Sequence, residues 1–297
     1  TADEIRNNLR DTVDLSFDTW LSSIKHNSAN RDVFVPTLKP EHQNPLHFNL
    51  FRGLDIQHMD CRDADPEACK PLLDHIHKVL ARGRDDVFRA IVLTWARMLQ
   101  GIEHGHLDWI KSDVCMLFLS RPGAGKGTPT RHMRTIIGPK YSCQLSKKRQ
   151  LFGDFNDNTG RDKLWVEMDE LLWAGNHEHA NDFKNMITED TQTVNPKFKK
   201  ERAYDSYHNY IITTNSDWAA QIDRDDRRFT VYDCDDTHAG PLTATNREYF
   251  GRLHDPKNGP NTISLSFAKF LYELDGTADF IPSMSIIDTD GRREQKI

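Results

Sequence analysis

Apolar residues recur at two different spacings along the chain, and the spacing changes near residue 110. Between Asp85 and Ile102, apolar side chains recur every three or four residues, which places them on one face of a helix. Residues 114–119 are instead continuously apolar, which is typical of a buried strand. Three later runs predict further strands: residues 164–168, 210–214 and 229–232.

Helical stretches lie between the first three apolar runs, and this alternation indicates the fold class. Strands that alternate with helices build a mainly parallel sheet with helices on its faces. The sequence therefore predicts an α/β fold with a central, mainly parallel sheet. The helix that begins near Asp85 is expected to pack against other elements and to take no part in catalysis.

Composition narrows the class of protein. The 297 residues are 37% hydrophobic and 28% charged, with a net charge of −6, which excludes an intrinsically disordered chain. No apolar run approaches the roughly 20 residues of a membrane helix, so we expect no membrane contact. Five scattered cysteines without a Cys-x-x-Cys pair argue against a disulfide framework or a zinc module. We expect a cytoplasmic or host-cell interior location, and a segment of a longer chain.

A glycine-rich turn follows the first predicted strand, reading Ser-Arg-Pro-Gly-Ala-Gly-Lys-Gly-Thr at residues 120–128. Such turns aim backbone N–H groups at phosphates, and a lysine at the helix start neutralises their charge. The usual G-x-x-x-x-G-K-[ST] pattern is broken at Ser120 and at Gly127, which leaves Thr128 as the nearest hydroxyl for Mg²⁺. An ordinary Gly/Pro turn is the alternative. The predicted contacts to ATP are Pro122, Gly123, Ala124, Gly125, Lys126, Gly127 and Thr128.

Two carboxylates end the second predicted strand, at the edge where open α/β sheets bind ligands. Asp169 is the better partner for Mg²⁺, and Glu170 is the better general base for an attacking water. Glu167 is a weaker candidate on the same strand. An exposed acidic helix cap would look the same.

Polar residues also flank the last two predicted strands. Asn215 ends the third strand, where its amide could bind a γ-phosphate or the attacking water, or could simply form a turn. Arg227 and Arg228 directly precede the fourth strand, and a guanidinium there could stabilise transition-state charge. A surface Asp/Arg network is the alternative.

A basic hairpin is predicted over residues 188–202, with a turn at Asn195-Pro196. Residues 197–202 hold four cations and one anion beside Phe198, as suits contact with a nucleic-acid strand. Solvated hairpin tips have the same composition. The predicted DNA-binding residues are Lys197, Lys199 and Lys200.

Residues 187–197, 211–215 and 226–229, in this order, closely resemble superfamily 3 helicases of viruses and phages, in their poxvirus primase-helicase-like branch. Residues 151–156 resemble the segment between that branch's phosphate loop and its acidic motif. The resemblance covers about residues 90 to 235. It implies a P-loop AAA+-like core that hydrolyses ATP between the subunits of a homo-oligomer, usually a hexameric ring, and pulls single-stranded DNA.

The resemblance also implies a role for individual residues. By position, Lys126 matches the Walker A lysine, Asn215 the sensor residue and Lys197 the channel hairpin cation. Asp169 and Glu170 match the Walker B pair, and Arg227 or Arg228 matches the arginine finger. We expect a mostly helical N-terminal or collar region over 1–105, the ATPase core over 106–245 and a C-terminal extension over 246–297. A primase domain upstream in a longer chain would fit the same family.

Two other functions remain open at this point. A monomeric P-loop kinase for a nucleotide or small molecule would share the phosphate loop, the acidic pair and the arginines. A nucleotide-binding, DNA-associated scaffold with little turnover would account for the missing hydroxyl at Gly127.

Overall fold

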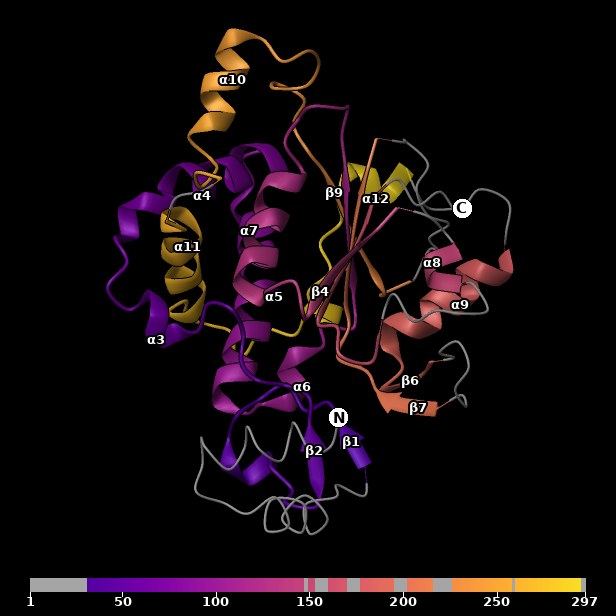
Figure 1. Ribbon diagram of the computed structural model, residues 1–297. Coiled ribbons are helices and arrows are strands. Elements are labelled where there is room, and N and C mark those ends of the chain that lie inside the picture. Colours follow the sequence, from indigo (N-terminus) through magenta and orange to yellow (C-terminus); the bar gives the residue numbers. More distant parts are fainter. Residues whose placement is uncertain are drawn as a thin grey trace, which may run out of the picture.

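The computed structural model of the protein describes residues 31–146, 149–152, 160–169, 177–194, 202–215, 226–257 and 260–294. A five-stranded parallel sheet lies at its centre, with helices on both faces (Figure 1). The strand order across the sheet is β4-β5-β8-β3-β9. The predicted α/β fold is therefore confirmed. The strands are β3 (Cys115–Leu119), β4 (Ser142–Leu145), β5 (Trp165–Asp169), β8 (Asn209–Thr214) and β9 (Phe229–Asp233).

All four strands predicted from apolar runs lie in this sheet. The strand that the sequence did not predict, β4, forms one edge and reads Ser-Cys-Gln-Leu. Its composition differs from that of β3, in which all five residues are buried. An edge strand needs less apolar surface than a central strand, so it gives a weaker signal.

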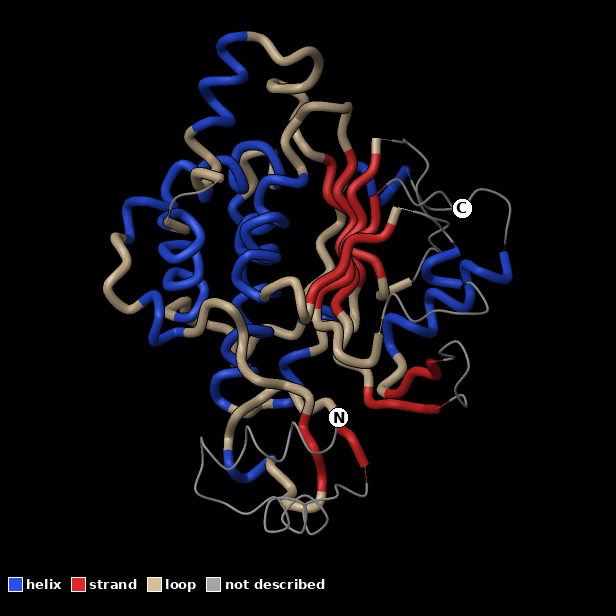
Figure 2. Tube along the Cα trace, in the orientation of Figure 1, coloured by secondary structure: helices blue, strands red, loops and turns tan. Residues whose placement is uncertain are grey.

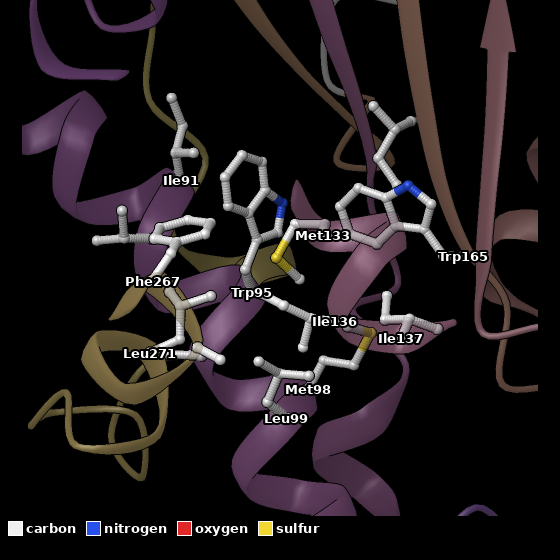
Figure 3. Packing of buried hydrophobic residues seen from close by; sticks show 14 of the residues in the cluster. Ile91, Trp95, Met98, Leu99, Met133, Ile136, Ile137, Trp165, Phe267 and Leu271 are labelled. Atoms are coloured by element: carbon white, nitrogen blue, oxygen red, sulfur yellow. The ribbon is translucent and has the colours of Figure 1, made fainter. Parts of the chain in front are cut away.

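One face of the sheet is covered by α5 (Asp85–His104), α7 (Gly127–Ile137) and α11 (Thr262–Tyr272). Figure 3 shows their apolar side chains meeting those of the sheet. The rings of Trp95 from α5 and Trp165 from β5 meet edge to face, with centroids 5.9 Å apart. The predicted apolar stripe of α5 is confirmed, because its five residues are all buried: Val87, Ile91, Trp95, Met98 and Ile102.

The opposite face carries a smaller hydrophobic cluster, and Figure 2 shows helices on that side of the strands. Alternate residues along a strand point to opposite faces, so Cys115 and Leu117 of β3 turn toward this cluster. Phe183 packs edge to face on Tyr210 of β8, with ring centroids 5.2 Å apart. The helices on this side are α8 (Arg149–Phe152), α9 (His177–Thr188) and α12 (Asp290–Glu294).

Smaller elements surround the sheet. The parallel pair β1 (Arg31–Val33) and β2 (His47–Asn49) lies at one end, and the antiparallel pair β6 (Thr191–Val194) and β7 (Arg202–Asp205) forms a hairpin. The helix α10 (Ala244–Gly251) projects beyond the other end (Figure 1). The remaining helical segments are η1 (Pro40–His42), α3 (His58–Cys61), η2 (Pro66–Cys69), α4 (Lys70–His75), η3 (Ile76–Leu80), α6 (Leu107–Ile110) and η4 (Pro282–Met284).

The expected three regions are not tested by this architecture, and they stay a prediction. Within the described residues, α5 shares one hydrophobic core with the sheet, although it was assigned to the N-terminal region. No helix in the described part of the chain is long and apolar enough to cross a bilayer.

Candidate functional site

The loop between β3 and α7 has a conformation that depends on two glycines. Gly123 and Gly125 have φ angles of +86° and +96°, a region that L side chains rarely adopt. A Cβ atom at Gly123 would lie 2.7 Å from the carbonyl oxygen of Gly240, so a larger residue would displace backbone. The chain then enters α7 at Gly127. The predicted succession of buried strand, tight loop and helix is present.

The ammonium group of Lys126 is held by acceptors from two neighbouring strand ends. It donates to the carbonyl oxygen of Ser120 at 2.9 Å, to the Ser120 hydroxyl at 2.8 Å and to Asn215 Oδ1 at 2.8 Å. Ser120 follows β3, and Asn215 follows β8. The Arg121 carbonyl oxygen lies at 3.4 Å as a further acceptor, and the lysine is only 8% exposed. Ser120, which breaks the usual motif, therefore helps to hold the lysine.

A cleft of about 570 Å³ opens beside Lys126. Its walls come from the glycine-rich loop, α7 and the carboxyl ends of β5 and β8. Because β8 lies between β3 and β5, Lys126, Asp169 and Asn215 line one cleft. The other predicted nucleotide contacts in its lining are Gly123, Gly125, Gly127 and Thr128. Pro122 accepts a bond from the Gly240 amide through its carbonyl, and Ala124 is buried in the loop.

The carboxylate of Asp169 has one hydrogen-bond donor for each of its oxygens. Oδ1 accepts from the Thr213 hydroxyl at 2.8 Å, and Oδ2 accepts from the side-chain amide of Gln144. A carboxylate has about four lone pairs, so lone pairs remain on both oxygens. The predicted general base, Glu170, lies outside the described residues.

The residues around Asp169 fit Mg²⁺ that arrives with a nucleotide. No cluster of three or more His, Cys, Asp or Glu side chains that could hold a metal occurs in the described parts of the chain. Mg²⁺ commonly uses one or two carboxylates together with substrate phosphates, which does not require such a cluster. Thr128, the predicted second ligand, is buried and lines the same cleft.

Glu167 has a different environment from Asp169, although both lie on β5. It is 2% exposed, accepts from the Thr130 hydroxyl at 2.9 Å and lies 3.2 Å from Arg134 Nε. Burial raises its pKa, while Arg134 and the Thr130 hydrogen bond oppose that shift. Both partners belong to α7, so Glu167 links this strand to the helix after the loop. The weaker ranking of Glu167 as a base agrees with this pairing.

A buried histidine supports the glycine-rich loop from behind, and it was not among the residues predicted from the sequence. His75 is 0% exposed, with Nε2 3.1 Å from the Gly125 carbonyl and Nδ1 2.9 Å from the Tyr249 hydroxyl. A carbonyl only accepts, so Nε2 carries the hydrogen and Nδ1 accepts from the tyrosine. Desolvation lowers the pKa of His75 to about 4. The imidazole thus connects the loop to α10.

The predicted arginines lie opposite the cleft, at the edge of the sheet where the parallel strands begin. The Arg228 carbonyl accepts from the Cys115 amide at 2.7 Å, at the start of β3. A five-residue strand spans roughly 16 Å, and this length separates the arginines from the loop after β3. Arg227 is exposed, whereas Arg228 Nη1 lies 3.7 Å from Asp226, a carboxylate that is 7% exposed.

The structure has an antiparallel hairpin here: β6 lies within the predicted range of 188–202, whereas β7 begins at Arg202, the last residue of that range. β6 and β7 are antiparallel, with Val194 opposite Arg202. β7 leads into the start of β8, so the hairpin lies at the same edge as Arg227 and Arg228. The turn and the predicted DNA contacts lie outside the described residues: Lys197, Lys199 and Lys200.

Sequence and structure comparisons relate the chain to phage replication proteins. Residues 118–228 match a family described as a family of unknown function, DUF5906. Over 218 residues, the chain is 24% identical to the DNA primase-polymerase of Nitratiruptor phage NrS-1. The aligned part is 69% of this chain and 28% of the phage protein, so the chain spans less than a third of that relative.

Solved structures of the NrS-1 C-terminal region have a similar fold. The A form of the apo structure superposes with a TM-score of 0.66 at 21% identity, covering 89% of this chain and 59% of that one. A second apo structure gives 0.65 at 22% identity, with coverages of 89% and 58%. At these identities the likeness establishes a shared fold.

Proposed function

We propose that this chain is the ATP-hydrolysing core of a phage DNA replication protein, a superfamily 3 helicase of AAA+ type. One observation carries the proposal: Lys126, Asp169 and Asn215, from three separate parts of the sequence, line one cleft beside a glycine-rich loop. The similarity to a phage DNA primase-polymerase supports a role in phage DNA replication.

Each group in the cleft has a role in phosphoryl transfer to water. The backbone amides of the loop bind the phosphates, and Lys126 neutralises their negative charge. A phosphate oxygen would compete with Asn215 for Lys126, which frees the asparagine amide to orient the attacking water. Glu170, next to Asp169 in sequence, accepts the proton of that water.

The cleft supplies ligands for Mg²⁺ through Asp169 and Thr128. The ion would offset phosphate charge in the transition state. Thr213 and Gln144 donate to the Asp169 carboxylate and keep it facing the cleft.

Single-stranded DNA and a second copy of the chain complete the proposal. The arginines lie a strand's length from the loop of their own chain, so they would serve the cleft of a neighbouring copy in a ring. The hairpin of β6 and β7 carries the three predicted lysine contacts to DNA, and it projects from the same edge.

The first experiment measures phosphate release from ATP with Mg²⁺, with and without single-stranded DNA, together with the mass of the assembly. We expect DNA-stimulated release from an oligomer, and a loss of at least about 100-fold in Lys126→Ala. The control is Lys140→Ala, an exposed lysine whose ammonium donates to the Leu50 carbonyl and lies over the Tyr141 ring.

The rival functions give different results in this assay. A monomer that ignores DNA and transfers phosphate to a small acceptor would be a kinase. Tight ATP binding without phosphate release would identify a nucleotide-binding scaffold. Either result would contradict the motor proposal.

A further inference from the structure

A chain of polar contacts among four side chains begins and ends on β5. Glu167 Oε2 lies 3.2 Å from Arg134 Nε on α7. Arg134 donates through Nη1 to Gln144 Oε1 on β4, and Gln144 donates through Nε2 to Asp169 Oδ2. Glu167 and Asp169 are two residues apart, so they lie on the same face of β5. The sequence singled out neither Arg134 nor Gln144.

The donors and acceptors in this chain permit one orientation of the Gln144 amide. A guanidinium only donates, so the amide oxygen must face Arg134. An ionised carboxylate only accepts, so the amide nitrogen must face Asp169. A rotated amide would bring oxygen against carboxylate and nitrogen against guanidinium. Arg134 therefore determines that Gln144 presents a donor to Asp169.

Arg134 is in turn anchored by a buried charge. Glu167 is 2% exposed, and a buried carboxylate needs a compensating cation. Arg134 supplies that cation, while its side chain remains 26% exposed and lines the cleft. Thr130, also on α7, donates to the other oxygen of Glu167. Helix α7 is thus joined to β5 through the Arg134–Glu167 ion pair in its last turn and the Thr130 hydrogen bond nearer its start.

We propose that Gln144 is a positioning residue for the metal ligand Asp169. Gln144 holds Oδ2 and Thr213 holds Oδ1, which leaves one direction on each oxygen for a cation in the cleft. This inference rests on the proposed function, because it concerns the Mg²⁺ that accompanies the nucleotide. Groups that orient metal ligands typically affect metal affinity 10- to 100-fold.

The test separates binding of the metal from binding of the nucleotide. A fluorescent, non-hydrolysable ATP analogue is titrated against the full chain in EDTA, and then with increasing Mg²⁺. In Gln144→Ala we expect unchanged affinity in EDTA and a rise of about tenfold or more in the Mg²⁺ needed for half-maximal effect. Because Gln144 is exposed on an edge strand, this variant should fold, and its melting temperature is recorded.

Two further variants complete the test. Thr135→Ala is the matched control, since Thr135 neighbours Arg134 on α7 and its hydroxyl donates to the Arg131 carbonyl of its own helix. Arg134→Gln combined with Glu167→Gln removes the ion pair without leaving a lone buried charge. This double variant should also raise the Mg²⁺ requirement, because Gln144 loses the Arg134 partner that holds its amide oxygen.

The outcomes distinguish this inference from the proposed function. If Gln144→Ala needs the same Mg²⁺ concentration as the wild type, the positioning role is overturned and the ATPase proposal stays intact. A wild-type chain that binds no analogue, with or without Mg²⁺, would overturn both.

Discussion

The central sheet has a carboxyl edge, where its strands end, and an amino edge, where they begin. These two edges differ in how many of the contacts of a functional site are formed within one chain. At the carboxyl edge, polar side chains from four elements contact one another around a cleft, and Lys126 has acceptors from two strand ends. At the amino edge, Arg228 pairs with Asp226, Arg227 is exposed, and the hairpin of β6 and β7 projects. No described residue of the amino edge lines the cleft.

Under the proposed function, this difference separates the part of the reaction that one chain supports from the part that a second copy supplies. The carboxyl edge would hold the nucleotide. The amino edge has exposed cations that lie roughly a strand's length, about 16 Å, from that nucleotide. In the proposed ring, each amino edge would face a neighbouring carboxyl edge, and turnover would depend on both.

The largest expected effect follows from removing the exposed arginine of the amino edge. Arg227→Ala should lower ATP turnover by about 10³-fold or more, as loss of an arginine finger does. Mixing it with Glu170→Gln chains should restore part of the activity, since some interfaces then pair an intact cleft with an intact arginine. Phosphate release is measured across mixing ratios, with Arg62→Ala as an exposed-arginine control. No recovery at any ratio contradicts catalysis between subunits.

The next largest effect is the loss of folding stability when an ion pair at either edge is broken. Asp226→Asn removes the carboxylate that lies 3.3 Å from Lys184 Nζ, where the lysine side chain is only 10% exposed, and should lower the free energy of unfolding by about 3–5 kcal/mol. Glu167→Gln leaves Arg134, which is 26% exposed and can be hydrated, so the loss should be about 1–3 kcal/mol. Urea denaturation measures both. Equal losses of unfolding free energy in the two variants would show that hydration of the remaining cation does not reduce the destabilisation.

The hairpin lysines are expected to affect DNA binding alone. Replacing Lys197, Lys199 and Lys200 together by alanine should reduce the slope of log affinity against log salt by about 2, if each contacts one phosphate of a single strand. ATP hydrolysis without DNA should persist, because the cleft is unchanged. Titrations with single-stranded DNA at several salt concentrations measure the slope. An unchanged slope places the DNA elsewhere.

The smallest effect concerns two buried histidines, one near each edge. His75 contacts Gly125 and Tyr249, and His208 contacts Gly160 and Tyr210 in the same manner. Burial lowers the pKa of each imidazole to about 4. The unfolded chain therefore binds protons first on acidification, so stability is present above pH 6.5 and is lost as the pH falls toward 4.

At pH 5.5 each histidine should account for about 1 kcal/mol of lost stability relative to pH 7. His75→Gln and His208→Gln should each flatten this dependence in denaturation measured at several pH values. His75→Gln should also weaken nucleotide binding, because it contacts the loop, whereas His208→Gln should not. If the two variants change nucleotide affinity equally, nucleotide binding does not depend on the contact between His75 and the loop.

The strands could be predicted because buried parallel strands carry apolar runs, as β3 does along its whole length and β8 does at residues 210–212. Their order could not, because β8 follows β5 in the chain but lies between β5 and β3. The contact between Lys126 and Asn215 depends on that order. The position of Arg227 could have been inferred, since a residue that precedes a parallel strand lies at the edge opposite a loop that follows one.

The site residues that were not predicted from the sequence belong to no local motif. Their roles depend on contacts with other elements of the fold. Gln144 lies on an unpredicted edge strand, and Arg134 is one of many arginines on helices. His75 lies about 50 residues before the loop that it contacts. Their contacts are made between elements distant in sequence, so no local pattern encodes them.

The hydrogen bonds of Lys126 compete with any phosphate that enters the cleft. Ser120 and Asn215 already hold the ammonium group, so an incoming phosphate must displace at least one of them. A hydrogen bond to a charged group contributes about 1.5–3 kcal/mol, so under the proposed function the affinity for ATP would be reduced by whatever is displaced. When product phosphate leaves, the same bonds would re-form and oppose its rebinding. In that function, Ser120 and Asn215 would act as an internal competitive inhibitor that favours product release.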